Sequence, residues 1–434
     1  MSQASLTQWL TKIEAIHQKP IDMGLDRVAA VAHQLEIFSA SNNAIKFIVA
    51  GTNGKGSTCA MLESILLAAG YSVATYTSPH ISHFNERARI GGISVRDEQL
   101  IAQFEKVDAV RGATSLTYFE FTTLAILNLF ASAKVDVQIL EIGLGGRLDA
   151  VNIVDPDCSI VTCVDLDHME FLGDTREKIG FEKAGIFRAG KPAICSDPVP
   201  PQSLIDHANL IGADLWLFGR DYNYSGDRQQ WSYSGRGQRR NSLAYPSLRG
   251  ANQLLNASGV LSALESVRQR LPVTAGAVRI GLATVELIGR FQVLPGRPAV
   301  VVDVAHNPHA IAHLASNLDN MGFFPYTYAV VGMLADKDII SSLAKLLDKV
   351  DHWLLCSLPG ARGASADRLE EVLLGLGVKP NGHDKTITKI DGIEHAPSRA
   401  LALARGIAAE ADRILVFGSF LTVADVQTET SHGR

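Results

Sequence analysis

One stretch, Ile45–Gly70, constrains the fold of this chain more than any other. It begins with the apolar, β-branched run Ile45–Ala50, which is typical of a buried parallel strand. The glycine-rich segment Gly51–Ser57 follows, and Thr58–Ala69 then has helical periodicity, with Gly70 placed to end the helix in a left-handed conformation. Strand, glycine-rich turn and helix together predict an α/β fold built on a parallel sheet.

The turn between this strand and this helix has the composition of a phosphate-binding loop. Glycines let main-chain N–H groups close on phosphate oxygens, and the helix N-terminus adds the positive end of its dipole. Lys55 supplies a cation, and Ser57 can offer a hydroxyl to Mg²⁺. The usual P-loop pattern would have a glycine at Val49 and a serine or threonine at Gly56. A glycine-rich turn without a ligand is therefore the alternative to a nucleotide-binding loop.

Length and composition indicate a two-domain globular protein. The chain has 434 residues, of which 47% are hydrophobic and 20% charged, and its net charge of −5 gives no reason to expect nucleic acid or a membrane surface as partner. Thr122–Ala133, among the longest apolar stretches, is too short to span a bilayer, and Met1–Pro20 lacks the apolar core of a signal peptide. The five cysteines lack paired Cys-x-x-Cys spacing, which favours buried thiols in a reducing cytoplasm over a zinc site.

The alternation of strands and helices restarts late in the chain. Gln292–Pro298, which contains two prolines and a glycine, is interpreted as a linker. Ala299–Val304 then opens a second series of strands and helices that has no glycine-rich phosphate loop of its own. The sequence thus predicts a P-loop parallel-sheet ATPase domain over residues 1–296, followed by a smaller Rossmann-like α/β domain over residues 297–434.

Polar side chains occur where several predicted strands end. Glu141 ends one apolar strand, Ser78 follows another and His168 follows a third. In parallel α/β sheets, ligands bind at the carboxyl ends of the strands, and a carboxylate there suits Mg²⁺. A lone histidine is more often structural, but its place at this edge favours binding of metal or phosphate by His168.

Three further residues allow two interpretations each. Asp22 precedes a glycine turn that opens a helix, so it could cap that helix or contact a ligand. Glu120, within the aromatic run Leu116–Phe121, is either a helix-start acid favoured by the dipole or a ligand contact. Lys183, beside Glu182, is either half of a surface ion pair or an inward-pointing side chain, because an apolar run follows it.

Taken together and in order, these motifs resemble the Mur ligase superfamily and, within it, the folylpolyglutamate synthase family in its bifunctional, dihydropteroate-using form. The resemblance runs from Ile21 to Phe420. It is carried by IDMGLDR, GTNGKGS, TSPH, LTYFE, LEIGLGGRLDAVN, DLDH, EKAGIF, the helix with Asn256, GRF and DVAHNPH. The resemblance also accounts for the unusual loop, because GTNGKGS is this family's own variant.

The resemblance implies an ATP-dependent ligase that adds L-glutamate to 7,8-dihydropteroate and further glutamates to reduced folates through an acyl phosphate. Phosphoryl transfer between two anions needs concentrated positive charge, which Lys55, Arg290, Mg²⁺ at two sites and the loop amides would supply. ATP and Mg²⁺ are the expected cofactors, and a monovalent cation such as K⁺ is left open. The expected partners are small molecules only, and the expected state is a monomer.

The same resemblance assigns roles to individual residues. The catalytic residues would be Lys55, Lys183, His168 and Arg290. ATP would be bound by Thr52, Asn53, Gly54, Lys55, Gly56, Ser57, Asn256, Arg290, Asp303 and His306. Mg²⁺ would be held by Ser78, Glu141 and His168, with Lys183 modified to N6-carboxylysine. The pteroate pocket would be lined by Asp22, Met23, Gly24, Thr117, Tyr118, Phe119, Glu120, Leu148, Asp149 and Ala150.

Other functions agree with the sequence less well. A peptidoglycan-building Mur ligase carries a UDP-sugar-binding domain ahead of the loop, and about fifty residues precede the loop here, too few for a typical domain. A monofunctional folylpolyglutamate synthase is closer, but IDMGLDR and LTYFE favour the bifunctional form. A P-loop switch protein would need Asn-Lys-x-Asp to read guanine, and the sequence lacks it. Asn252-Gln253 replaces the family's common His-Gln pair, which weakens the case for an adenine contact from position 252.

Overall fold

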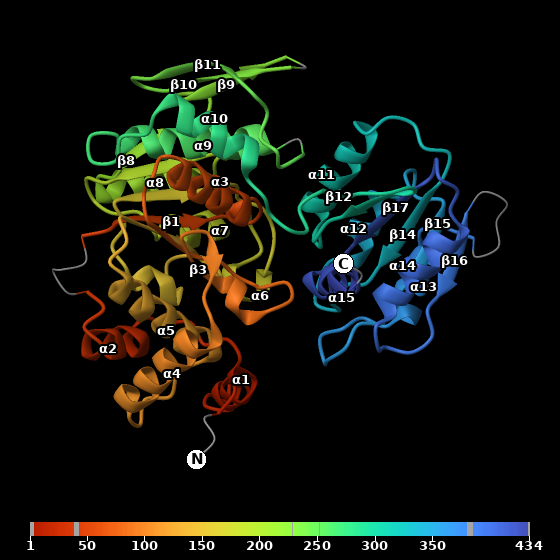
Figure 1. Cartoon of the computed structure of the whole chain (residues 1–434), viewed down its shortest axis with the longest axis horizontal. Coiled ribbons are helices and arrows are strands. Elements are labelled where there is room, and N and C mark those ends of the chain that lie inside the picture. Colours follow the sequence, from red (N-terminus) through yellow and green to blue (C-terminus); the bar gives the residue numbers. More distant parts are fainter. Residues whose placement is uncertain (1–3, 39–42, 228, 251, 380–384, 433–434) are drawn as a thin grey trace. The chain divides into compact units, whose positions relative to one another are not determined.

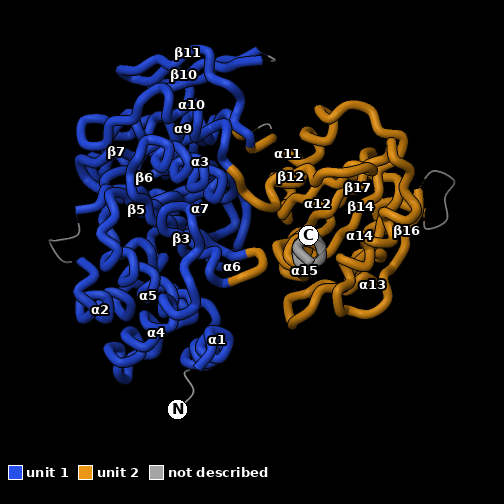
Figure 2. Tube along the Cα trace, in the orientation of Figure 1, with its two compact units in different colours: residues 1–80, 84–247, 254–285 blue, residues 81–83, 248–253, 286–434 orange. Residues whose placement is uncertain are grey.

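The structure, a computed structural model, describes residues 4–38, 43–227, 229–250, 252–379 and 385–432, and for residues 428–432 it describes the backbone alone. The chain divides into two units, which Figure 2 colours separately. The first unit comprises residues 1–80, 84–247 and 254–285, and the second comprises residues 81–83, 248–253 and 286–434.

The predicted strand Ile45–Ala50 is β1, and it lies inside the large sheet of the first unit (Figure 1). Within the described residues the strand order of this sheet is β4-β3-β2-β5-β1-β6-β7-β8. All neighbouring pairs from β2 to β8 in this order are parallel, while β3 and β4 add an antiparallel edge. The bounds are β2 Val73–Tyr76, β3 Ala88–Ile90, β4 Ile93–Ser94, β5 Val137–Glu141, β6 Cys158–Val161, β7 Pro192–Cys195 and β8 Asp214–Leu217.

Helices cover both faces of this sheet, and a small antiparallel sheet of order β11-β10-β9 completes the unit. The helices are α1 Leu6–Glu14, α2 Asp26–Gln34, α3 Lys55–Ala68, α4 Asp97–Arg111, α5 Tyr118–Ala133, α6 Met169–Leu172, α7 Arg176–Ala184, α8 Gln202–Ile211, α9 Gln253–Ser266 and α10 Ala275–Thr284. Two 3-10 turns, η1 Phe84–Arg87 and η2 Ala150–Ile153, and the strands β9 Asn223–Gly226, β10 Trp231–Ser234 and β11 Arg239–Leu243 make up the rest.

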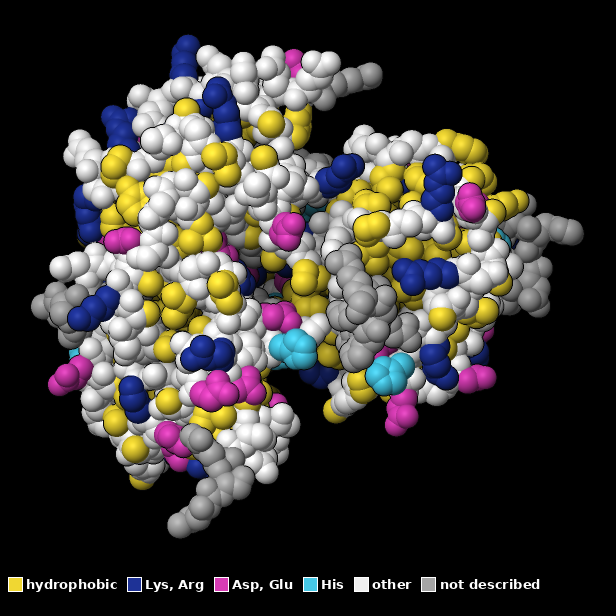
Figure 3. Space-filling view, in the orientation of Figure 1, with side chains coloured by type: hydrophobic (Ala, Val, Ile, Leu, Met, Phe, Trp, Pro, Cys, Tyr) yellow, Lys and Arg dark blue, Asp and Glu magenta, His cyan; other side chains and the backbone are white. Residues whose placement is uncertain are grey.

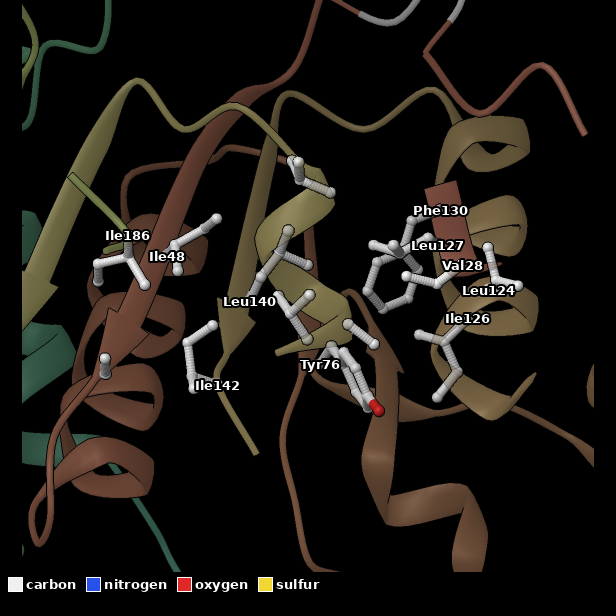
Figure 4. Close-up of a cluster of buried hydrophobic side chains, with 14 of the residues drawn as sticks. Val28, Ile48, Tyr76, Leu124, Ile126, Leu127, Phe130, Leu140, Ile142 and Ile186 are labelled. Atoms are coloured by element: carbon white, nitrogen blue, oxygen red, sulfur yellow. The ribbon is translucent and has the colours of Figure 1, made fainter. Parts of the chain in front are cut away.

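The core of the first unit follows from the alternation of side chains along its strands. Ile48 of β1, Tyr76 of β2 and Leu140 of β5 pack with Val28 of α2 and Phe130 of α5, and all five are fully buried (Figure 4). Burying side chains of this size stabilises the fold by about 1.5–3 kcal/mol each. Helix α3 packs against β1, β2 and β5, and its buried residues do not belong to this cluster, so it covers the other face.

The second unit is a separate α/β layer structure. Within the described residues its sheet has the order β12-β13-β17-β14-β15-β16, parallel except for β12. The strands are β12 Gln292–Leu294, β13 Ala299–Val302, β14 Thr327–Val331, β15 His352–Leu355, β16 Thr386–Lys389 and β17 Arg413–Phe417. The helices are α11 Pro308–Asp319, α12 Ile339–Ala344, α13 Ala366–Gly375, α14 Ala396–Ile407 and α15 Phe420–His432.

Two buried clusters line the two faces of this second sheet. Val301 packs on one face with residues of α11, α12 and α13, whereas its neighbours Val300 and Val302 pack on the other face with residues of α14 and α15. A strand buried on both faces is hydrophobic throughout, which explains the uninterrupted valine run. Two mostly parallel sheets covered by helices confirm the predicted α/β fold class, and α3 follows the glycine-rich turn as expected.

One predicted linker is wrong. Gln292–Leu294, the start of the proposed Gln292–Pro298 linker, is strand β12 and pairs antiparallel with β13. The chain instead passes from the first unit to the second between Val285 and Glu286. The prolines and the glycine of this segment indicated a linker. They follow a three-residue strand at the edge of the sheet, and an edge strand tolerates proline nearby. The functional division into residues 1–296 and 297–434 stays a prediction.

The surface carries both signs of charge. Figure 3 shows Lys and Arg interspersed with Asp and Glu on the visible face of each unit, in agreement with the small net charge of −5. Among the described residues, none of the helices has the length and apolar character that crossing a bilayer requires.

Candidate active site

The turn after β1 holds the predicted phosphate-binding residues at the carboxyl edge of the first sheet. Gly54 has a φ of +91° and is the N-cap of α3, and as a glycine it offers no side chain that would cover the start of the helix. Lys55 Nζ donates to the carbonyl oxygens of Gly51 and Thr52 at 3.0 and 3.3 Å, so the ammonium group lies over the loop. A helix N-terminus beside a lysine fits an anionic phosphate group.

The segment after β6 fixes the shape of this loop. Thr52 N donates to Cys163 O at 2.8 Å, and Thr52 Oγ1 exchanges hydrogen bonds with the main chain of Asp165 at 2.9 and 3.0 Å. A Cβ on Gly51 would lie 1.8 Å from Thr162 Oγ1, and Gly51 has a φ of +151°. Only glycine can occupy this position, since any side chain would displace the loop or the neighbouring strand end.

Asn256 of α9 reaches the same loop. A Cβ on Gly54 would lie 2.8 Å from Asn256 Oδ1, and Asn256 is 6% exposed. The structure therefore brings this predicted nucleotide-binding residue beside the loop, although about two hundred residues of sequence separate them.

The residues predicted to hold Mg²⁺ come from neighbouring strand ends. Ser78 N donates to Glu141 Oε2 at 3.1 Å, as expected from strands β2 and β5 that lie side by side. His168 has a φ of +50° and is the N-cap of α6, with its Nε2 4.0 Å from Asp167 Oδ2. Among the described residues, His, Cys, Asp and Glu form no group of three or more that would bind a metal ion by themselves. Mg²⁺ commonly binds one or two carboxylates together with waters and phosphates, so Glu141 fits such a shared site.

Lys183 points inward from α7. It is 3% exposed, and burial, followed by repulsion from Lys55, lowers its pKa to about 7. Its neighbour Glu182 pairs with Arg147 instead, at 2.8 Å. The surface ion pair that the sequence allowed for Lys183 is therefore wrong. A lysine with a substantial neutral fraction at pH 7 lies close enough to the phosphate loop to be affected by the charge of Lys55.

The ten residues predicted to line the pteroate pocket belong to three segments of the first unit. The ring of Phe119 lies against the backbone of Gly143, where a Cβ would be 2.5 Å from it, and stacks on Tyr76 with centroids 6.2 Å apart. Met23 Cε lies 3.9 Å from the position of a Cβ on Gly145. An aromatic ring beside Gly143 and a thioether near Gly145 are apolar groups of the kind that bind a flat heteroaromatic ring.

Two of the three carboxylates in this set accept hydrogen bonds from the protein on both of their oxygens. Glu120 Oε2 accepts from Thr117 N at 2.8 Å in a capping box at the start of α5, and Glu120 Oε1 accepts from Arg27 Nη2 at 3.0 Å. Asp149 accepts from the amides of Leu144 and Val151 at 2.8 and 2.9 Å, and burial raises its pKa to about 6. The helix-start interpretation of Glu120 is therefore confirmed.

The third carboxylate, Asp22, does not cap a helix. Helix α2 begins at Asp26 with Leu25 as its N-cap, so the capping interpretation of Asp22 is wrong. Asp22 Oδ2 instead accepts from Arg27 Nη1 at 2.7 Å and from His17 Nε2 at 3.2 Å. The sequence predicted no role for Arg27 or His17. A signal for Arg27 was present, because the dipole opposes a cation in the first turn of a helix, so an arginine there needs another reason.

The predicted ATP-contacting residues of the second unit lie together at the end of β13. Asp303 accepts from the amides of Phe291 and Ala305 at 2.8 and 2.7 Å, and burial raises its pKa while Arg290 opposes that shift. The Arg290 guanidinium and the His306 ring lie 5.6 and 6.1 Å from the centre of the Phe420 ring.

Comparison with known proteins agrees with this geometry. A Mur ligase middle domain matches residues 49–245, and a Mur ligase, glutamate ligase domain matches residues 289–420. A dihydrofolate synthase/folylpolyglutamate synthase of Escherichia coli (strain K12) is 44% identical over 421 residues, which cover 97% of this chain and 94% of that protein.

Two solved structures are similar over the whole chain. E. coli FolC in complex with DHPP and ADP superposes with a TM-score of 0.92 at 42% identity, covering 100% of both chains. A bifunctional folylpolyglutamate synthase/dihydrofolate synthase with Mn, AMPPNP and L-glutamate bound superposes with a TM-score of 0.88 at 41% identity, covering 99% of this chain and 98% of that chain.

Proposed function

The chain belongs to the Mur ligase family, and from that premise we propose that it is an ATP-dependent ligase that joins L-glutamate to 7,8-dihydropteroate and adds further glutamates to reduced folates. The observation that carries this proposal is the 44% identity to the E. coli dihydrofolate synthase/folylpolyglutamate synthase over 97% of the chain. The phosphate loop, the inward lysine and the apolar surface around Phe119 supply the parts that such a reaction needs.

Amide formation from a carboxylate requires activation of that carboxylate. The γ-phosphoryl group of ATP passes to a carboxylate oxygen, which gives ADP and an acyl phosphate. The amine of L-glutamate then attacks the acyl carbon, and phosphate leaves as the amide forms and the amine loses a proton. Lys55 and the N-terminus of α3 would bind and orient the phosphates, and Arg290 would add positive charge.

Mg²⁺, held by Ser78, Glu141 and His168 at two sites shared with phosphate oxygens and waters, would supply further positive charge where negative charge develops. The contact between Ser78 N and Glu141 Oε2 supports this assignment, because it holds two of the three residues together. Thr52–Ser57, Asn256, Asp303 and His306 would complete the ATP site. A bound divalent metal in a similar enzyme supports a metal requirement here.

Lys183 would serve as an N-carboxylated residue. A carbamate forms when a neutral amine attacks CO₂ and releases a proton, and a pKa of about 7 leaves a substantial neutral fraction at neutral pH. The modification would replace a buried cation, which repels Lys55 and Mg²⁺, by an anion that attracts both. The burial of Lys183 and its proximity to Lys55 support this role.

The remaining assignments follow the same family pattern. Asp22–Gly24, Thr117–Glu120 and Leu148–Ala150 would bind the pteroate, residues 1–296 would act as the ATP-binding domain and residues 297–434 as the ligase domain. We expect a cytoplasmic monomer, and assay in K⁺-free buffer tests the monovalent cation. A monofunctional folylpolyglutamate synthase is the second candidate, supported by a solved folylpolyglutamate synthase from Thermotoga maritima with a TM-score of 0.81 at 26% identity.

A paired-substrate assay tests the proposal. Purified protein should release phosphate from ATP only when Mg²⁺, L-glutamate and either dihydropteroate or tetrahydrofolate are present, and mass spectrometry should detect the glutamate adduct of each acceptor. Extension of tetrahydrofolate alone would favour the monofunctional enzyme. Phosphate release without any acceptor would contradict the ligase function itself.

A further inference from the structure

The guanidinium of Arg27 joins two of the three segments proposed to bind the pteroate. Its Nη1 donates to Asp22 Oδ2 at 2.7 Å, and its Nη2 donates to Asp22 O at 2.8 Å and to Glu120 Oε1 at 3.0 Å. One side chain in the first turn of α2 therefore ties the loop before that helix to the start of α5. Planar, forked donors make arginine suited to such a bridge.

This bridge leaves the three proposed pteroate carboxylates in different states. Both oxygens of Glu120 and both oxygens of Asp149 already accept hydrogen bonds from the protein. Asp22 accepts through Oδ2 alone, and its Oδ1 has no hydrogen-bond partner among the described residues. The Asp22 side chain is 28% exposed, so the residue as a whole is open to a ligand.

A second side chain holds Asp22 from the other direction. His17 Nε2 lies 3.2 Å from Asp22 Oδ2, and His17 Nδ1 lies 2.8 Å from Ser115 Oγ, whose hydroxyl can donate to it. Because a carboxylate only accepts, Nε2 is assigned the hydrogen in this contact. Arg27 and His17 together fix the rotation of the carboxylate and direct its Oδ1 away from both donors.

We propose that Arg27 is a positioning residue, which holds Asp22 so that Asp22 Oδ1 accepts a hydrogen bond from the amino-bearing edge of the substrate's pterin ring. This inference rests on the proposed function for the identity of the substrate. The pterin ring carries a 2-amino group and a ring N–H, and both donate to a carboxylate. The apolar surface of Phe119 and Met23 would bind the faces of the ring, and Asp22 would read its edge.

The chemistry of such a contact makes Asp22 a specificity residue. A site built to hydrogen-bond a donor rejects an analogue that lacks it, because its own polar group is then left unpaired. If Asp22 could rotate freely, its carboxylate could hydrogen-bond with water when the ligand lacks a donor. The enzyme would then discriminate less between the substrate and such an analogue. The bridge from Arg27 therefore matters for recognition of the ring as well as for stability.

The test compares Arg27→Gln, Arg27→Lys and Asp22→Asn with the wild type, using dihydropteroate and its 2-desamino analogue as probes. In wild type the analogue should have a KM about tenfold higher than dihydropteroate. Arg27→Gln should raise the KM for dihydropteroate about tenfold or more, should reduce the discrimination against the analogue, and should leave the KM for ATP within about twofold. Arg27→Lys should raise the KM for dihydropteroate less than Arg27→Gln does, because lysine keeps the positive charge but lacks the forked donors of the guanidinium group.

Arg111→Gln is the matched control. Arg111 also joins a carboxylate and a main-chain carbonyl in the first unit, pairing with Asp108 at 2.7 Å and with Thr114 O at 3.1 Å, and its side chain is 18% exposed. This variant should change neither KM by more than about twofold, because neither Asp108 nor Thr114 belongs to the proposed pteroate or ATP site. Thermal unfolding of every variant shows whether it folds.

Three results would overturn the proposal. The first is an unchanged KM for dihydropteroate in Arg27→Gln, and the second is an equal rise in the KM for dihydropteroate and ATP. The third is unaltered discrimination in Asp22→Asn, which decides the question if both Arg27 variants fail to fold. Wild-type protein without glutamate-dependent turnover of dihydropteroate would instead contradict the proposed function.

Discussion

At the scale of single residues, the candidate site contains ionisable side chains whose charged forms are destabilised by burial. Lys183 is buried, and burial together with repulsion from Lys55 lowers its pKa to about 7. Asp149 and Asp303 have raised pKa values for the same reason, burial, although main-chain amides compensate part of the cost. Such costs are typical of residues kept for chemistry rather than for stability.

Replacing Lys183 by methionine should therefore separate activity from stability. Lys183→Met should reduce ligase activity by about 100-fold or more, because no carbamate can form. The same variant, compared with wild type in CO₂-free buffer near pH 6, should be more stable by about 1–4 kcal/mol, because a buried cation is replaced by an apolar side chain of similar length. Steady-state kinetics and urea unfolding measure the two effects.

The sign of the pH dependence makes this prediction sharper. The pKa of Lys183 is about 7 in the folded protein, against 10.5 as its ordinary value. Between these two values the unfolded chain binds more protons, so the free energy of unfolding of the wild type rises with pH across this window. The stability advantage of Lys183→Met should thus be greatest below pH 7 and shrink toward pH 10. A wild type that is the more stable form at low pH would contradict the assignment.

Residue roles were predictable from the sequence only where a motif marked them. Lys183 and Glu141 stand in motifs, and the structure buries both. Arg27 also stands in a motif, but its partners Asp22 and Glu120 are five and ninety-three residues away in sequence, and no local pattern indicates which carboxylate a guanidinium will reach. Long side chains that bridge distant segments are set by tertiary packing, which a single sequence does not display.

At the scale of elements, the strand–turn–helix unit β1–α3 depends on its glycines to different degrees. Gly51 combines a φ of +151° with a Cβ position 1.8 Å from Thr162 Oγ1, so a side chain there meets both strain and a clash. Gly70, at the other end of α3, has a φ of +87° with no atom within 4 Å of its Cβ position. The two positions therefore separate conformational strain from steric exclusion.

Gly51→Ala and Gly70→Ala should differ accordingly. Gly70→Ala should cost about 1 kcal/mol, which is the strain of a left-handed alanine, and should leave the affinity for AMPPNP unchanged. Gly51→Ala should cost about 3 kcal/mol or more and should weaken AMPPNP binding, because the loop must move away from Thr162. Urea unfolding and calorimetric titration provide the measurements. Equal effects of the two substitutions would mean that the loop relaxes around the extra methyl group.

The elements themselves were largely readable from the sequence, and the exceptions are physical. Strand β1 has the predicted bounds, because apolar β-branched runs flanked by glycine are distinctive. Helix α3 begins at Lys55, three residues before the predicted start, since the glycine-rich first turn conceals helical periodicity. The edge strand β12 was taken for a linker, because three residues beside prolines carry too little pattern.

At the scale of the whole molecule, each unit has its own hydrophobic clusters, and each contains residues to which the proposed function assigns a role in ATP binding. The loop residues and Asn256 belong to the first unit, whereas Arg290, Asp303 and His306 belong to the second. If the proposed function is correct, a nucleotide should stabilise the protein through residues of both units, and the loss of either set should reduce the stabilisation.

Two aspartates of the second unit offer a matched pair for testing this. Asp303 accepts from the amides of Phe291 and Ala305, and Asp412 likewise accepts from the amides of Tyr326 and Ala409, at 3.2 and 2.8 Å. Replacing either by asparagine removes one charged acceptor from a pair of main-chain donors. Both Asp303→Asn and Asp412→Asn should therefore lower the Tm of the nucleotide-free protein, by an amount corresponding to about 1–3 kcal/mol.

Only one of the two should alter the response to nucleotide. AMPPNP with Mg²⁺ at about a hundred times its Kd should stabilise the wild type by about 2.7 kcal/mol, and the same concentration should stabilise Asp412→Asn equally. Asp303→Asn should show a clearly smaller rise in Tm, as should Lys55→Met in the first unit. An equal rise in both aspartate variants, with Lys55→Met impaired, would place ATP binding in the first unit alone. Such a result would remove Asp303 from the nucleotide site while leaving the phosphate loop in it, so the two halves of the assignment are tested separately.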